Sequence, residues 1–125
     1  MNALSRIIEA VRPGGSILDL QVIRPNPEVE LNSRVIAELD GEALFRWADA
    51  AVAAVDARIR AGDLVEEAVD DHDVREYYTD GADLVEGFAD SKRRIPEEFL
   101  PTLASIEEPL AVRESCRLRR LRARS

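Results

Sequence analysis

The amino-acid sequence predicts an α+β domain with a mixed, mostly antiparallel sheet of four or five strands and three or four helices. Apolar residues recur at helical spacing in separate stretches, and between these stretches lie segments that are β-branched or alternate in polarity. The 125 residues suit a single domain of ordinary size. Because the sequence also shows no internal repeat and no low-complexity linker, we expect one domain over residues 1–125.

The chain begins with the pattern of a helix followed by a buried strand. Helical spacing predicts a helix from Asn2 to Arg12, whose apolar stripe consists of Leu4, Ile7, Ile8 and Val11. Pro13-Gly14-Gly15 ends this helix, because proline cannot continue a helix and glycine accepts left-handed backbone angles. The apolar run from Ser16 to Ile23 predicts a strand with both faces covered.

A break and a hairpin are expected next. The segment Arg24-Pro25-Asn26-Pro27 predicts a stiff, extended interruption of the strand. Val29–Leu31 and Arg34–Leu39 flank the polar pair Asn32-Ser33, which is typical of a β-hairpin.

The longest expected helix runs from Glu42 to Ala61. Asp40 is a favourable N-cap, and Gly62 stands where a C-terminal cap glycine belongs. Phe45 and Trp47 flank the apolar stripe, so we expect both aromatic side chains to be at least partly buried. The stripe itself consists of Leu44, Ala48, Ala51, Val52, Val55 and Ile59.

The C-terminal half is predicted to alternate strands with short helices. Its elements are strands at Leu64–Val69 and His72–Tyr78, separated or bent near Asp70-Asp71, a helix at Ala82–Asp90 capped by Asp80, one or two helical turns after Pro96, and a strand at Leu110–Leu121. Along the last strand, alternation places Leu110, Val112, Cys116 and Leu118 on one face. The other face carries Arg113, Ser115, Arg117 and Arg119.

Charge is unevenly distributed along the chain. Residues 1–110 hold 24 acidic and 11 basic side chains, whereas residues 111–125 hold Glu114 and six arginines. The acidic body argues against broad nucleic-acid binding, which needs a basic surface. The arginines either keep an outer strand face in water, contact phosphate, or meet an acidic face of another subunit. In the first case their partners on a neighbouring strand are acids such as Glu66, Glu67 or Glu76.

Membrane insertion and disulfide formation are not expected. No apolar run approaches the roughly 20 residues of a membrane-spanning helix, and the N-terminus lacks a signal-peptide pattern. Cys116 is the single cysteine, which excludes a disulfide within the chain. We therefore expect a cytoplasmic protein.

No complete catalytic, cofactor or metal motif is present. Ile17-Leu18-Asp19-Leu20 imitates the start of a nucleotide-binding site, but no glycine-rich loop follows it. Asp70-Asp71-His72-Asp73 offers metal-ligating groups, yet neighbouring strand residues point to opposite faces. Cys116 on an apolar strand face is interpreted as a small hydrophobe. We assign no catalytic, cofactor-binding or metal-binding residue. We interpret Trp47, Tyr77 and Tyr78 as aromatic residues of the core or of an interface.

One family resemblance bears on the fold. From Ile7 to Leu20 a helix, Arg-Pro-Gly-Gly and an apolar strand with an aspartate near its end follow one another. This pattern resembles class I S-adenosylmethionine-dependent methyltransferases, in which a helix ends in a proline-glycine-glycine turn just before the fifth strand. The later elements are similar to the C-terminal half of that family too, including Asp80–Phe88, Ile95-Pro96 and a closing antiparallel strand at Val112–Leu121.

The resemblance implies an incomplete fold. The family's glycine-rich cofactor loop and its ribose-binding acidic residue precede the matching region, so no residue here is carried over as a cofactor contact. No cofactor is expected, and S-adenosylmethionine is expected only if another polypeptide supplies the N-terminal half. The parallel neighbour of the fifth strand is also missing, which leaves Ser16–Ile23 with an unpaired edge. Either the hairpin strand Arg34–Leu39 covers this edge, or two copies pair there as a homodimer.

Three functions are compatible with these features. Our leading hypothesis is a methyltransferase-like remnant without catalysis of its own, which acts by association with itself or with another chain. The second is the C-terminal part of a functional methyltransferase that a separate polypeptide completes. The third is a small-ligand-binding domain with its pocket between the long helix and the sheet.

Overall fold

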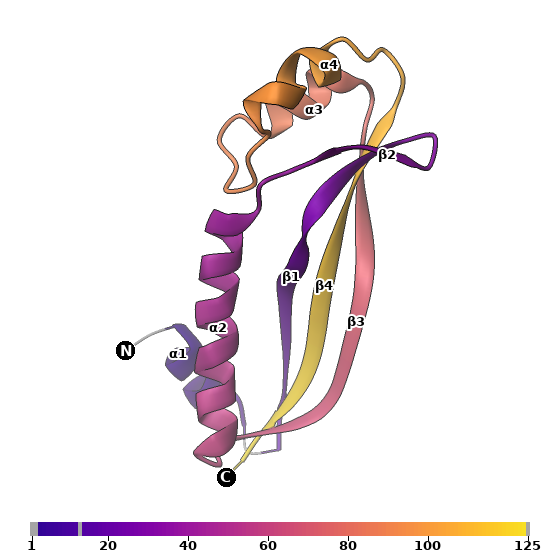
Figure 1. The fold of residues 1–125 in the computed structure, drawn as a ribbon. Coiled ribbons are helices and arrows are strands. Elements are labelled where there is room, and N and C mark those ends of the chain that lie inside the picture. Colours follow the sequence, from indigo (N-terminus) through magenta and orange to yellow (C-terminus); the bar gives the residue numbers. More distant parts are fainter. Residues whose placement is uncertain (1–2, 13, 125) are drawn as a thin grey trace.

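A computed structural model describes residues 3–12 and 14–124, which form a long sheet flanked by helices (Figure 1). In Figure 1, α2 runs beside the strands with α1 near it, and α3 and α4 lie at the other end of the sheet. The elements are, in order, α1 (Ala3–Ala10), β1 (Ser16–Leu31), β2 (Arg34–Glu38), α2 (Glu42–Arg60), β3 (Leu64–Tyr78), α3 (Gly81–Gly87), the 3₁₀ helix η1 (Glu97–Phe99), α4 (Leu100–Ala104) and β4 (Leu110–Ala123).

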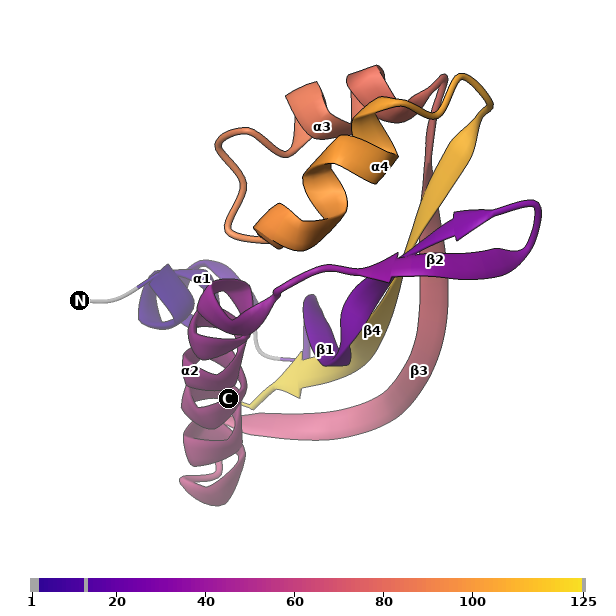
Figure 2. The same ribbon diagram turned by 45° about the horizontal axis from the view of Figure 1, so that its top comes forward.

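The sheet has four strands in the order β2-β1-β4-β3, and every neighbouring pair is antiparallel. The predicted α+β class, with four strands and four α-helices, is therefore confirmed. Figure 2 shows that the sheet is strongly curved, with β3 on the side away from α2 and bending round toward one end of that helix. No helix among the residues that the structure describes is long and apolar enough to cross a membrane.

The predicted break of the strand at Arg24–Pro27 is wrong, and of the two alternatives predicted near Asp70-Asp71, a separation or a bend, the separation is wrong. β1 continues through Arg24–Pro27, where its pairing with β4 shifts between Ile23 and Glu28. Prolines cannot donate to a ladder, so this stretch steps out of register while β4 runs straight past it. β3 likewise continues through Asp70-Asp71. There the arginines of β4 face the acids of β3, so an acidic pair does not end the strand.

The hairpin turn and the cap of α3 follow the sequence prediction, whereas Asp40, the predicted N-cap of α2, lies one residue before the observed N-cap. Asn32 and Ser33 form the turn between β1 and β2 with φ angles of 50° and 66°, as a two-residue hairpin turn requires. Gly41 occupies the N-cap of α2, and the Asp40 carboxylate accepts a hydrogen bond of 3.0 Å from the Glu42 amide. At α3, Asp80 accepts from the Asp83 amide at 2.8 Å.

The core consists of two clusters that lie on opposite faces of β4. Side chains of a regular strand alternate between faces, and no residue of β4 is bulged out of the ladder. Apart from Ala111, the buried side chains of β4 are even-numbered up to Cys116 and odd-numbered from Arg119 onward. The buried side of the strand therefore changes between these two residues.

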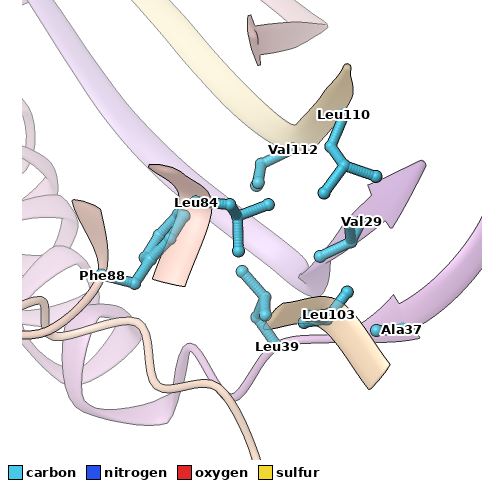
Figure 3. Packing of buried hydrophobic residues seen from close by; sticks show 8 residues of the cluster. All are labelled: Val29, Ala37, Leu39, Leu84, Phe88, Leu103, Leu110 and Val112. Atoms are coloured by element: carbon cyan, nitrogen blue, oxygen red, sulfur yellow. The ribbon is translucent and has the colours of Figure 1, made fainter. Parts of the chain in front are cut away.

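The first cluster joins the even-numbered side of β4 to α3 and α4 (Figure 3). Gly81 is required here, because a Cβ atom at this position would lie 1.6 Å from the Leu103 carbonyl oxygen of α4. The cluster contains Val29, Ala37, Leu39, Leu84, Phe88, Leu103, Leu110 and Val112.

The second cluster joins the odd-numbered side of β4 to α1 and α2. Its buried members are Ile17, Val55, Leu64, Leu121 and Ala123, and α1 packs against them through Leu4, Ile8 and Val11.

Arg119 also lies on this buried side, although alternation predicted a position on the solvent face. It is only 6% exposed. Its guanidinium contacts Asp56 of α2 at 2.9 Å and Glu66 of β3 at 2.6 Å. Two carboxylates from different elements thus compensate the desolvation of one arginine and tie α2 to the sheet.

The expectation for the two aromatic residues of α2 is half right. Phe45 is 3% exposed, whereas Trp47 is 69% exposed. Successive helical residues are about 100° apart, so these positions lie about 200° apart around the axis. Only one of them can face the sheet, and Phe45 does so.

Truncation of these two side chains should therefore have unequal effects. We expect Phe45→Ala to lower the free energy of unfolding by about 3–5 kcal/mol, because it removes a buried aromatic side chain. Trp47→Ala should change it by about 0.5 kcal/mol or less, as is usual for a surface position. Urea unfolding followed by circular dichroism measures both, and equal losses would contradict the packing of α2.

Candidate functional site

One edge of β1 is unpaired in the part of the chain that the structure describes. Residues Ser16 to Ile23 pair with β4, from Arg122 to Ser115. On the other side of β1, the strand β2 pairs only with Glu28–Leu31. The hairpin therefore does not cover the edge of Ser16–Ile23. The prediction that the hairpin strand protects this edge is wrong. An uncovered strand edge is a template for another strand.

An apolar surface adjoins this edge. Leu18 and Leu20 are 67% and 58% exposed. Val22 and Leu118 are half-buried beside them, and Leu118 is the direct partner of Leu20 in the ladder. We call these four residues the β1 surface. They lie on the even-numbered face of β4, opposite the face on which α1 and α2 pack.

A groove of about 400 Å³ lies on the helical side of the same strand segment. The Asp19 Oδ1 atom accepts a hydrogen bond of 2.9 Å from Gln21 Nε2. The Asp19 Oδ2 atom is buried and has no hydrogen-bond partner among the described residues. We call this the α2 groove, and its walls consist of Leu4, Ile7, Asp19, Gln21, Trp47, Ala50, Ala51, Ala54 and Val55.

Trp47 gives the α2 groove an aromatic wall. Its exposed indole also lies under the Lys92 ammonium, 4.7 Å from the ring centroid. The other two aromatic residues considered in the sequence analysis, Tyr77 and Tyr78, differ in their burial. Tyr78 packs against Phe88 with ring centroids 5.8 Å apart, whereas Tyr77 is exposed on β3. Burial and a hydrogen bond to Glu76 raise the pKa of Tyr78.

The arginines of β4 pair with acids of the neighbouring strands. Arg117 bonds Asp71 through Nε at 2.8 Å, and this bond holds the pKa of the Asp71 carboxyl below its ordinary value. Arg113 contacts Glu28, Glu30 and Asp73. Glu66 and Glu67 are partners as predicted, since Glu67 lies 3.4 Å from Arg122. These contacts agree with the first of the three interpretations of the arginine-rich strand, in which its arginines pair with acids of neighbouring strands.

The acidic run on β3 is divided between two faces. Asp71 and Asp73 point toward Arg117 and Ser115, whereas His72 Nδ1 lies 3.0 Å from Asp70 Oδ2. Among the described residues, no three histidine, cysteine or acidic side chains come together in a way that would hold a metal ion.

Cys116 is buried, as expected for a cysteine on the apolar side of a strand. Burial, and to a smaller extent the charge of Asp73, raises the pKa of its thiol. A protonated, buried thiol is a poor nucleophile.

Ser16–Leu20 forms the start of β1, and the strand continues beyond it to Leu31. Gly14, with φ of +80°, makes the turn from α1, and its amide donates to the Ala123 carbonyl at 2.8 Å. The turn thus ties the start of β1 to the end of β4.

In comparisons with known proteins, no protein-family model, no curated protein and no solved structure matches this sequence.

Proposed function

We propose that this chain acts by self-association, as a homodimer formed at the unpaired edge of β1 and the adjoining β1 surface. The observation that carries the proposal is an apolar strand segment, Ser16–Ile23, that is paired on one side only. Its exposed leucines, Leu18 and Leu20, stand beside the unpaired edge. A second copy supplies a strand for the edge and apolar side chains for the surface.

The family resemblance supports this proposal in two respects. β4 closes the sheet antiparallel to β1, as the resemblance implies for the last strand. The unpaired edge of Ser16–Ile23 lies where a methyltransferase would place a parallel neighbour. We propose that the chain is a methyltransferase-like remnant that needs no cofactor of its own and uses this edge for association.

The energetics favour specific pairing over aggregation. Burying a leucine side chain is worth about 1.5–3 kcal/mol, and a two-fold dimer buries each such residue twice. The formal net charge of −8 opposes non-specific clustering of many copies. A closed dimer removes the exposed edge, whereas an open chain of copies would leave one at each end.

The cytoplasmic location is part of the same proposal. A single buried cysteine, Cys116, fits a reducing compartment. Nucleic acid is not proposed as a partner, because Arg113, Arg117 and Arg119 are already engaged by acids.

Light scattering after size exclusion tests the association. At tens of micromolar we expect twice the monomer mass of 13.9 kDa, at low and at high salt. Leu18→Lys combined with Leu20→Lys should give the monomer mass with an unchanged circular dichroism spectrum. Val35→Lys is the matched control, since Val35 is 51% exposed but lies on β2, and should stay dimeric. A monomeric wild-type chain under all these conditions would refute the proposal.

The α2 groove favours a second candidate function, binding of a small amphipathic ligand. Its lining is mostly apolar, with alanines that leave room beside Trp47. Asp19 is the one acidic residue among the described residues of that lining, and its Oδ2 atom has no hydrogen-bond partner among them. An apolar ligand with an ammonium group therefore complements the groove better than one with a carboxylate.

Trp47 is the single tryptophan and reports binding in this groove directly. We expect decylamine to shift its fluorescence to shorter wavelengths in a saturable way, and decanoate to bind at least about tenfold more weakly. Asp19→Asn should abolish this preference. Asp49→Asn, which changes an exposed acid of α2 outside the groove, should keep it. Equal responses to both compounds in the unmodified chain would rule out a role for Asp19.

A further inference from the structure

The hydrogen bonds at the base of β1 show which of its residues face the unpaired edge. The Ala123 amide donates to the Gly15 carbonyl at 2.9 Å, so the carbonyl of Gly15 points toward β4. Backbone groups of an antiparallel strand alternate between its two neighbours. Ile17, Asp19 and Gln21 therefore also bond β4, and the even-numbered residues between them direct N–H and C=O outward. These outward-facing residues are Leu18, Leu20 and Val22.

A two-fold pairing of β1 with itself must place outward-facing residues opposite each other. Two arrangements give the longest overlap of Ser16–Ile23 with its copy. In one, the symmetry axis passes by Leu20, so Leu20 faces the partner's Leu20. In the other, the axis passes by Asp19, so the Asp19 carboxylates of the two copies face each other. Both satisfy the alternation of backbone hydrogen bonds.

The side chains distinguish these two arrangements. Like charges directly opposite each other destabilise an antiparallel pair, which disfavours the axis at Asp19. With the axis at Leu20, Asp19 faces the partner's Gln21, an amide that can donate to a carboxylate. On the other face, Leu18 meets the partner's Val22, and the row of apolar side chains continues without interruption across the axis.

We infer that the homodimer forms by antiparallel addition of β1 to β1 with Leu20 on the two-fold axis. This inference rests on the proposed self-association and adds the register and the surface. The two four-stranded sheets join into one, and the β1 surfaces of both copies form a single apolar patch on one face. The helices α1 and α2 of both copies then lie on the opposite face, since they pack on the other side of β1.

Cysteine cross-linking tests the register. Directly opposite residues of a hydrogen-bonded pair have Cα atoms about 5.5 Å apart, within the range of about 4.4–6.8 Å that a disulfide spans. In a Cys116→Ala background, Leu20→Cys should give a disulfide-linked dimer on mild oxidation, reversed by dithiothreitol. Leu18→Cys should not, because the two Leu18 positions lie about 13 Å apart along the strands. Both positions are exposed, so the substitutions leave the core intact.

A mixture of the Leu18→Cys and Leu20→Cys chains tests the rival register. If the axis lies at Asp19, these two positions face each other, and peptide mass spectrometry finds a disulfide between them. That result would overturn the inference. Absence of any cross-link from chains that light scattering shows to be dimeric would overturn the register and leave self-association standing. A monomeric mass for these variants and for the unmodified chain would contradict both the register and the self-association.

Discussion

β4 pairs along its length with β1 on one side and β3 on the other, and its buried side changes between Cys116 and Arg119. The remaining architecture depends on this change. The helices α3 and α4 cover one face at one end of the sheet, and α1 and α2 cover the opposite face at the other end. Because no helical layer extends over a whole face, half of each face is left to be stabilised in another way.

The two uncovered halves differ in chemistry. On the odd-numbered side, Arg113 and Arg117 bond acids of β1 and β3, so the charges of this half are satisfied within the chain. On the even-numbered side, Leu18 and Leu20 face solvent next to an unpaired strand edge. The first half is complete in a monomer, whereas the second gains stability when a second strand is added. The proposed dimer follows from this difference.

The elements could be predicted from the sequence because their signals are local. Asp80 caps α3 by accepting a hydrogen bond from the amide of Asp83, three residues later in the chain. The turn at Asn32-Ser33 depends only on the backbone dihedral angles of these two residues. The change of buried side along β4 was missed, although the sequence carries a signal for it. Apart from Ala111, apolar residues stand at even positions up to Leu118 and at odd positions after the pair Arg119-Arg120. Leu118 belongs to the apolar series and is only half-buried, and Arg119 is buried because Asp56 and Glu66 reach it from distant segments.

The candidate site likewise has features that the sequence predicts and features that it does not. Composition predicts the strand Ser16–Ile23, but the expectation that both of its faces are covered is wrong within one chain, because Leu18 and Leu20 are exposed. Its unpaired edge was an implication of the family resemblance. The α2 groove could be placed only in outline, between the long helix and the sheet. Its aromatic wall depends on which way Trp47 turns around α2, and its unpaired Asp19 oxygen depends on how closely Gln21 approaches. Helical spacing does place Trp47 on one face of α2 with Ala50, Ala51 and Ala54, whereas nothing in the spacing indicates the unpaired Asp19 oxygen.

Backbone amide hydrogen exchange along β1 tests the central claim most directly. The Ile17, Asp19 and Gln21 amides bond β4 and should exchange slowly at every protein concentration. The outward-facing amides of Leu18, Leu20 and Val22 should exchange rapidly in dilute solution and become protected as the concentration rises through the range of dimer formation. If these three amides exchange rapidly at all concentrations, the edge stays uncovered and the account of this protein as a self-associating domain is contradicted.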